Sequence, residues 1–326
     1  MDLAVQEQLN GQTQRVKKGI PGSTLKWIAI IAMLIDHTGA ILLESQIMKE
    51  GTLEIESIFV IDFIMRLIGR FGFPIFAFLL VEGFTHTRSV KKYALNLSLF
   101  ALISELPFNL GFSGTLFYPG YQNVFFTLAI AVVTLTGVQY VEEHLLEKNN
   151  PILYWISCFV AGVIGSYLFI GSQFGMFFLS LNVQSLAYWL LLALGGIVGL
   201  IICAIVSRKW NQEKKNVFTY VVYPILAGLV VADLLKTDYA AWGVFTVLVI
   251  YYYRHKKVKA MAMGCLSLSI MSLMEVTAFF MLIPVSKYNG KRGMNLKYFF
   301  YAFYPVHIAL LYLLALACGY VSFAIR

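Results

Sequence analysis

The chain has 326 residues, of which 59% are hydrophobic, 15% aromatic and only 13% charged, and its mean hydropathy is +0.75. Soluble domains carry about a quarter charged residues, so the composition excludes a water-soluble globular protein. The formal net charge of +8 does not indicate nucleic-acid binding, because the basic residues punctuate apolar segments instead of covering a soluble face.

Apolar segments of membrane length recur from Leu25 to Tyr320, and the polar gaps between them are short. A transmembrane helix needs about 20 apolar residues. The sequence therefore predicts an all-α, polytopic membrane bundle of about ten helices, in one domain over residues 25–320 that follows a polar tail at 1–24. The predicted spans are 25–44, 57–85, 91–112, 121–143, 152–170, 183–206, 217–235, 239–254, 259–284 and 298–319.

The loop charges orient this bundle. With the N-terminus inside, 17 of the 25 lysines and arginines lie in the tails and cytoplasmic loops and 2 lie within a span. The positive-inside rule thus predicts both termini in the cytoplasm. The six predicted outside are Lys49, Lys236, Lys287, Lys291, Arg292 and Lys297. The basic segment 288–293 contradicts the rule, so either it has a functional role or one span is miscounted.

Ionisable side chains within the spans are costly in a membrane, so each marks a candidate functional residue. At about 1.5 Å per residue along a helix, several of them converge on the middle or outer half of the membrane. They are Asp36, His37, Arg66, Arg70, Glu105, Glu275 and His307. Asp36 and His37 are consecutive and point about 100° apart, so Asp36 is expected to hold an arginine or histidine of another helix. The alternatives are structural ion pairs for the arginines and backbone-bonded core residues for the histidines.

A second group lies where the second and third spans meet, at the predicted cytoplasmic surface. It contains His86, Arg88, Lys91 and Lys92. A group of cations at the surface, below a buried polar cluster, suits an anionic cofactor whose narrow extended chain reaches into the bundle. Ordinary positive-inside topology would also explain these cations. The four cysteines lie in apolar segments without metal-ligand spacing, so no metal site is expected.

Seven short motifs strongly resemble the TraX family. The matching motifs are Leu34–Gly39 (LIDHTG), Ile68–Phe76 (IGRFGFPIF), Glu82–Ser89 (EGFTHTRS), Ile103–Phe108 (ISELPF), Asn123–Thr127 (NVFFT), Tyr288–Gly293 (YNGKRG) and Tyr301–His307 (YAFYPVH). They occur in the right order over roughly residues 24–130 and 235–314, whereas 150–216 contributes nothing.

The resemblance implies an activity. The family is named for a conjugation protein that N-acetylates pilin in the membrane, and it looks related to transmembrane acyltransferases that use cytoplasmic acyl-CoA. It therefore implies an acetyltransferase of the bacterial cytoplasmic membrane, with acetyl-CoA or another acyl-CoA as donor, membrane lipids around it, and a peptide, sugar or lipid acceptor. His37 matches the first-span histidine that the wider group uses as catalytic base. Asn96 departs from the pattern, because an arginine is expected there.

The residues and the resemblance support one mechanistic hypothesis. The phosphates of acyl-CoA would bind the group around Arg88, and His37 or His307 would act as general base on the acceptor. Asp36 or Glu105 would orient the imidazole. Oxyanion stabilisation is expected from Arg70 and Asn123, and helix breaks from Pro74 and Pro107.

Two other classes of protein stay open at this stage. A proton-coupled secondary transporter would use the same buried groups as a relay, but the two halves of the sequence show no inverted repeat. A non-catalytic scaffold would not account for so many ionisable groups at one depth.

Overall fold

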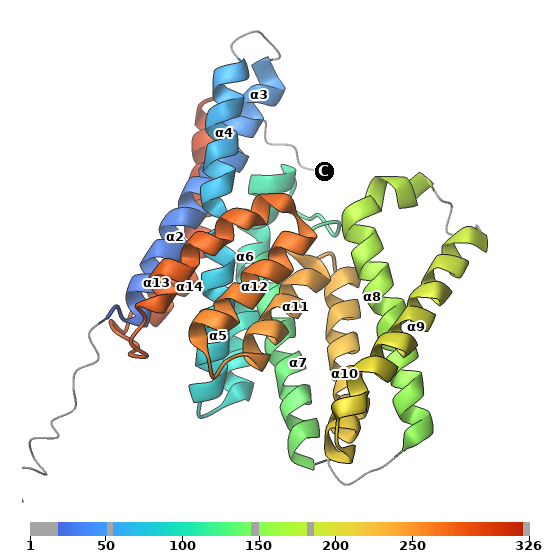
Figure 1. Ribbon diagram of the computed structural model, residues 1–326. Helices are drawn as coiled ribbons and strands as arrows, with labels where there is room; N and C mark the ends of the chain where they lie inside the picture. The colour runs from blue at the N-terminus through green and yellow to red at the C-terminus, as the bar shows by residue number, and fades with distance from the viewer. Residues whose placement is uncertain (1–18, 51–54, 145–149, 181–185, 322–326) are drawn as a thin grey trace, which may run out of the picture.

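The computed structural model describes residues 19–50, 55–144, 150–180 and 186–321, and these ranges are helical apart from short connections and two isolated β-bridges. The expected all-α polytopic bundle is confirmed (Figure 1). The elements are α2 Gly22–Thr38, η1 Gly39–Leu43, α3 Glu44–Glu50, α4 Ile55–Gly69, α5 Gly72–His86, α6 Val90–Ser113, α7 Val124–His144, α8 Pro151–Ser180, α9 Leu186–Val206, η2 Ser207–Lys209, α10 Gln212–Leu234, α11 Ala240–Tyr252, α12 Lys257–Met271, η3 Leu273–Met281, α13 Leu282–Ser286 and α14 Lys297–Ala317.

Eight helical segments in the described ranges are long and apolar enough to cross a membrane. Two shorter apolar segments, Ala240–Tyr252 and Leu273–Ser286, add to them. The chain is therefore a multi-pass membrane protein. The expected count of about ten treated helical pieces shorter than a full span as complete crossings.

The second span is broken between α4 and α5, at Arg70 and Phe71. Pro74 lies in the first turn of α5, where its missing N–H removes no intrahelical bond, so the break expected at Pro74 occurs just before it, between α4 and α5. The break expected at Pro107 is wrong, since α6 continues through it to Ser113. Neighbouring helices in a membrane bundle can compensate for the bond that such a proline removes.

Two helix starts are turned into the interior of the bundle. After α6 the chain folds back, so that Asn123, at the start of α7, donates to the carbonyl of Ala101 in the middle of α6, at 2.8 Å. The turn between α10 and α11 joins it there, because Gln122 and Thr237 form a parallel bridge. Asn123 and Thr237 are thus buried, at 0% and 2% exposure, although the sequence presents both as loop residues.

The predicted span 259–284 is in fact two segments that run in opposite directions. The chain is extended at Ser272, whose side chain accepts a bond from the amide of Met274 at the start of η3. Because α12 leaves one face and η3 with α13 returns to it, the segment 288–293 lies beside the start of α2. The amide of Gly22 donates to Lys291 O at 2.8 Å, and that of Ser23 to Arg292 O at 3.0 Å. The outer placement of this basic segment is therefore wrong: a span was miscounted.

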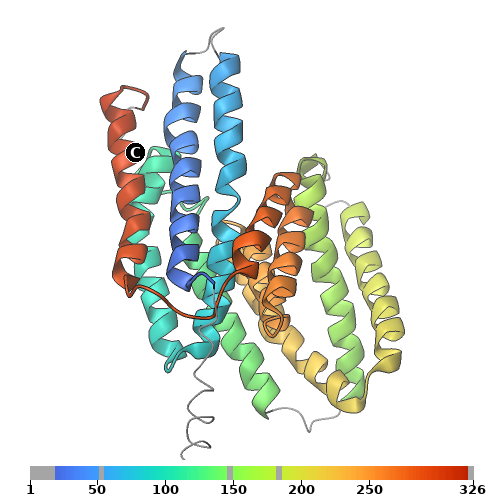
Figure 2. The same cartoon turned by 60° about the vertical axis from the view of Figure 1, so that its left-hand side comes forward.

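The last helix, α14, runs parallel to α2. Trp27 packs on Phe299 with ring centroids 5.4 Å apart, and further along both helices His37 stacks on His307 at 4.9 Å. Since both helices begin at the same face, the described chain starts at one face and ends at the other (Figures 1 and 2). The expected placement of both ends on one face thus does not hold for residues 19–321, and the tails 1–18 and 322–326 lie outside the described residues.

Described cations gather on the face where α2 begins, here called the basic face. It carries Lys26, Arg88, Lys91, Lys92, Arg208, Lys209, Lys214, Lys215, Arg254, Lys256, Lys257, Lys259, Lys287, Lys291, Arg292 and Lys297. In the described ranges the opposite face has Lys236, while Arg66 and Arg70 lie between the faces. The returning segment η3–α13 moves four cations to the basic face, so the charge asymmetry is stronger than the sequence predicted. Lys49, Lys148 and Arg326 belong to the parts whose side chains are not described.

Cysteine labelling tests this topology. Lys291→Cys and Lys91→Cys should react with a membrane-impermeant maleimide from the same side, whereas the native Cys318, exposed beyond the end of α14, should react from the opposite side. Each probe would be placed singly in a background in which the other native cysteines are serine. Labelling of Lys91→Cys together with Cys318, with Lys291→Cys reacting from the other side, would restore the uninterrupted 259–284 span and overturn the returning segment.

Candidate functional site

The centre of the bundle is held by a carboxylate between two arginines. Asp36 Oδ1 lies 2.8 Å from Arg66 Nη1 and 3.0 Å from Arg70 Nη2. Arg70 also donates through Nη1 to Glu275 Oε1 at 3.1 Å and through Nε to the carbonyl of Arg66 at 3.0 Å. This Asp36 network (Asp36, Arg66, Arg70 and Glu275) joins α2, α4 and η3. The prediction that Asp36 holds an arginine or histidine of another helix is confirmed, with two arginines as its partners.

Gly69 allows the Asp36 network to form. It stands directly before Arg70, and a Cβ atom at this position would collide with the Asp36 carboxyl group. Only a residue without a side chain lets α4 approach α2 this closely. The glycine of the IGRFG motif therefore leaves space for the Asp36 carboxylate, and the next residue of the motif, Arg70, binds that carboxylate.

The two histidines form a buried pair between α2 and α14. His37 Nδ1 lies 2.7 Å from His307 Nε2, and the two rings are within 7° of parallel. Phe112 and Tyr304 pack edge-on against the His37 ring. His37 is 8% and His307 5% exposed, so neither is a solvated surface residue. Two residues after His37, at Gly39, the helix widens into the π-helical turn η1, a feature often found at functional sites.

The hydrogen bonds of the histidine pair fix its tautomers. His307 Nδ1 lies 2.6 Å from the carbonyl of Phe303, which can only accept, so Nδ1 carries the hydrogen. In a neutral pair His307 Nε2 then accepts, and His37 Nδ1 is the donor. His37 Nε2 is left without a hydrogen, and no hydrogen bond to it is present within the described residues. The pair thus presents one unprotonated ring nitrogen.

A third polar pair joins α6 to the start of α7. Asn123 Nδ2 donates to Glu105 Oε2 at 2.6 Å, and Asn123 Oδ1 accepts from the amide of Phe125 at 3.1 Å. Asn123 is therefore the cap of a helix that begins inside the bundle. The other oxygen of Glu105 and Oδ1 of Asn109 are both buried without a partner. A proton on Glu105, or the reversed amide of Asn109, would join these two atoms.

The inward loops add residues that the sequence did not indicate. Tyr121 donates to Asp238 Oδ1 at 2.8 Å. The negative charge of Asp238 raises the pKa of Tyr121, whereas the charges of Arg66 and Arg70 lower it, which places this loop pair within electrostatic reach of the Asp36 network. Tyr239 stacks on Phe73 with centroids 3.9 Å apart. No motif or hydropathy pattern in the sequence indicates these residues, because their loops enter the bundle only through tertiary contacts.

Buried polar atoms without hydrogen-bond partners gather around these groups. They include Asp62 Oδ1, Ser104 Oγ, Glu105 Oε1, Asn109 Oδ1, Glu275 Oε2 and Tyr304 Oη. Such atoms cost free energy and are few in folded proteins. Their concentration next to the Asp36 network and the histidine pair marks this region as the candidate functional site.

Three parts of the predicted site differ from the expected geometry. Neither Asp36 nor Glu105 hydrogen-bonds His37, whose described partner is His307. Arg70 already uses Nε, Nη1 and Nη2 for protein acceptors, and the amide nitrogen of Asn123 is likewise occupied. In this state Asn123 has no free N–H for an oxyanion, and Arg70 retains only the second N–H of Nη1 and of Nη2, on nitrogens that already bind carboxylates. Within the described ranges no three His, Cys, Asp or Glu side chains are grouped as metal ligands.

The predicted cofactor-binding group lies on the basic face, away from the histidine pair. His86, Arg88, Lys91 and Lys92 are all exposed, around the turn from α5 to α6. His86 Nδ1 bonds to Glu82 O at 2.8 Å, and Ser89 caps α6 through the amide of Lys92. The structure thus groups the four residues at one turn.

Comparisons with known proteins place the chain in a family. The family profile described as "TraX protein" matches residues 21–193 and 196–315. The chain is also 26% identical over 299 residues to a protein of Dichelobacter nodosus named "Probable fimbrial assembly protein FimC, serogroup H1", which covers 88% of this chain and 92% of that protein. No solved structure matches significantly. The chain belongs to the TraX family, as its motifs predicted.

Removing one partner of the Asp36 network should destabilise the fold. Arg70→Met leaves Glu275, which is 1% exposed, without its cation, and loss of one partner of a buried ion pair costs about 3–5 kcal/mol. Arg70→Met/Glu275→Gln should recover part of this loss, because no uncompensated carboxylate stays buried. Unfolding in detergent measures both, with the exposed Arg208→Met as control. Equal stability of the single and double variants would show that the two residues are not coupled.

Proposed function

We propose that this member of the TraX family is an acyltransferase of the bacterial cell membrane, with acetyl-CoA or another acyl-CoA as donor and an amine or hydroxyl group as acceptor. The observation that carries the proposal is the histidine pair, which presents an unprotonated His37 Nε2 inside a largely apolar bundle. A group of this kind can act as a general base. The match of His37 to the first-span histidine of related acyltransferases supports the same role.

The two histidines would have different roles. His37 Nε2 would remove the proton from the acceptor nitrogen or oxygen as that atom attacks the thioester carbonyl carbon. The C–S bond then breaks, and the thiolate of coenzyme A leaves and takes up a proton. His307 would be a positioning residue, because its Nε2 accepts from His37 Nδ1 while its own Nδ1 is fixed by Phe303. This arrangement gives His307 the orienting role that the sequence assigned to Asp36 or Glu105.

The Asp36 network would hold this site in place. Asp36 precedes His37 on α2, and its two arginines fix that turn of α2 against α4. Arg70 would stabilise an oxyanion through the second N–H of Nη1 or Nη2, whose other N–H groups bind carboxylates. Arg66 Nη2 has no acceptor among the described residues and is a further donor for an oxyanion.

The charge asymmetry supports an orientation for the transfer. By the positive-inside rule the basic face would lie in the cytoplasm, where acyl-CoA is available. Arg88, Lys91 and Lys92 at its surface would attract the anionic donor. On the side away from the basic face, Glu44 and Asp238 lie near or beyond Arg66 and Arg70. Their negative charges would favour a cationic amine that approaches from the opposite face. The name of the relative from Dichelobacter nodosus supports a pilus-related acceptor, such as the amino terminus of a pilin.

Turnover assays with purified protein test this function. Release of coenzyme A from acetyl-CoA should require a peptide with a free amino terminus and should not occur with the same peptide blocked. His37→Gln should lower the rate by about 10²–10⁴-fold, the contribution of a positioned general base. His255→Gln, on the exposed turn after α11, is the matched control. A His37→Gln variant with wild-type turnover would contradict the proposal.

The positioning role of His307 has its own signature. His307→Phe keeps a flat ring but removes the acceptor for His37 Nδ1, so kcat should fall while KM for the acyl donor changes little. His307→Gln supplies an amide oxygen as acceptor and should restore part of kcat. An unchanged kcat in His307→Phe, or an equal loss in both variants with a raised KM, would refute this role.

A further inference from the structure

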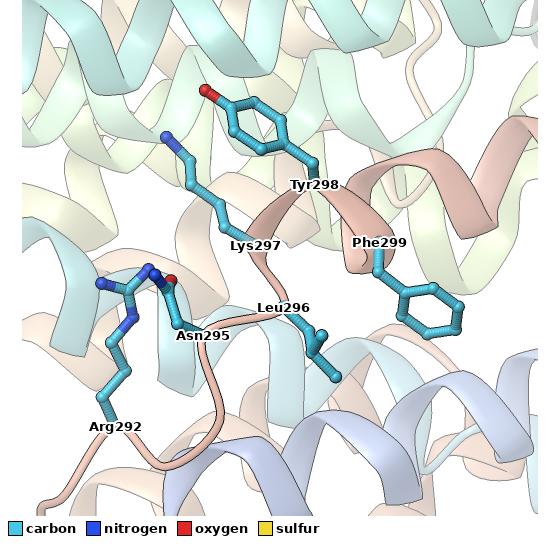
Figure 3. A pocket seen from close by; sticks show the side chains of 6 residues that line it. All are labelled: Arg292, Asn295, Leu296, Lys297, Tyr298 and Phe299. Carbon is cyan, nitrogen blue, oxygen red and sulfur yellow. The ribbon is translucent and has the colours of Figure 1, made fainter.

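A groove on the basic face is lined by both polar and apolar side chains. It has a volume of about 460 Å³ and is formed by Arg292, Asn295, Leu296, Lys297, Tyr298 and Phe299. Figure 3 shows the nitrogen-bearing ends of Arg292, Asn295 and Lys297 pointing to the same side, whereas Leu296 and Phe299 point away from them. The groove therefore has a side rich in hydrogen-bond donors and an apolar side.

The cations of this groove have no acidic partner in the part of the chain that the structure describes. Lys26 of α2 is near two of these residues, because Arg292 and Lys297 lie close enough to repel its charge. None of the three forms an ion pair with a described carboxylate. Lys26 lies 5.2 Å from the centre of the Phe300 ring, and Lys297 5.8 Å from that of Tyr301. Three cations held together without a counter-charge favour an anion between them.

The backbone around the groove adds to this preference. The backbone of Arg292 is held in place because its carbonyl accepts a hydrogen bond from the amide of Ser23. Helix α14 begins at Lys297, and its N-cap residue Leu296 supplies no side-chain acceptor for the first amides. The start of a helix carries a partial positive charge and free N–H groups. Cations, amides and a cavity thus converge at one place.

We propose that Lys26, Arg292 and Lys297, together with the start of α14, form a binding site for phosphate groups on the basic face. Guanidinium and ammonium groups bind phosphate oxygens by charge-assisted hydrogen bonds. Two sources carry this chemistry at a membrane surface: the phosphates of the acyl donor and the headgroup of an anionic phospholipid. Only the first source rests on the proposed function.

The position of the groove explains how it would serve the donor. It lies at the N-terminal ends of α2 and α14, the two parallel helices that carry the histidine pair. From Lys297 to His307 the helical rise is about 15 Å, a distance that a thin arm of the donor would have to cross. The exposed side chains of Tyr298 and Phe299 flank the groove and would equally suit the acyl chains of a lipid.

Ligand binding to a charge-removed variant tests the site. Lys26→Gln/Arg292→Gln/Lys297→Gln would be compared with wild type for binding of coenzyme A by calorimetry in neutral detergent, and of short-chain phosphatidylglycerol by native mass spectrometry. Loss of these charge-assisted contacts should weaken one of the two ligands by roughly tenfold to hundredfold. The matched control is Arg208→Gln/Lys209→Gln/Lys214→Gln, which removes three cations elsewhere on the basic face.

These outcomes test the phosphate-binding site and the proposed acyltransferase function independently of each other. Weaker coenzyme A binding identifies the donor as the source, and weaker phosphatidylglycerol binding alone identifies a lipid. Unchanged binding of both overturns the site, even if wild type binds coenzyme A as the proposed function requires. Failure of wild type to bind coenzyme A counts against the proposed function, while the lipid experiment still decides the site. Lys297→Glu, a single change at a half-buried residue, repeats the test if the triple variant does not fold.

Discussion

The arrangement of the site depends on one carboxylate shared by two guanidinium groups. Asp36 bonds Arg66 and Arg70, and Arg70 extends the contact to Glu275. A single buried charge in a membrane would be costly, but opposite charges at these distances compensate one another. Because the network ties α2 to α4 and η3, it also fixes the rotation of α2. The next residue, His37, is thereby turned about 100° away from the network and toward α14.

The second constraint is the break at Ser272. It returns the chain to the basic face, and the segment 288–293 then hydrogen-bonds to the start of α2. The same return makes α14 parallel to α2, which is what allows His307 to stack on His37. One extended residue between two short helical segments thus determines the charge asymmetry of the protein, the pairing of its histidines and the position of the groove beside Lys297.

The sequence predicted the helical class, most helix positions and the importance of the ionisable residues within the spans, because burying charge in a membrane demands a reason. It also predicted that Asp36 holds an arginine or a histidine of another helix, and the structure shows that the partners are arginines. It did not predict the pairing of His37 with His307, since the direction of α14 depends on how many times the chain crosses. A short apolar return such as 273–286 cannot be distinguished by hydropathy from the second half of one long span. The roles of Tyr121 and Asp238 were hidden for a related reason: their loops enter the bundle only in three dimensions.

The most direct test of the account is an experimental structure of the protein with a non-hydrolysable acyl-CoA analogue. We predict that the carbon equivalent to the thioester carbonyl lies beside His37 Nε2, with room for an acceptor atom at about 3–3.5 Å, and that the rest of the analogue runs between α2 and α14 toward the basic face. An analogue bound elsewhere, or a His37 Nε2 closed off from any ligand, would contradict the assignment of the histidine pair as the reacting centre.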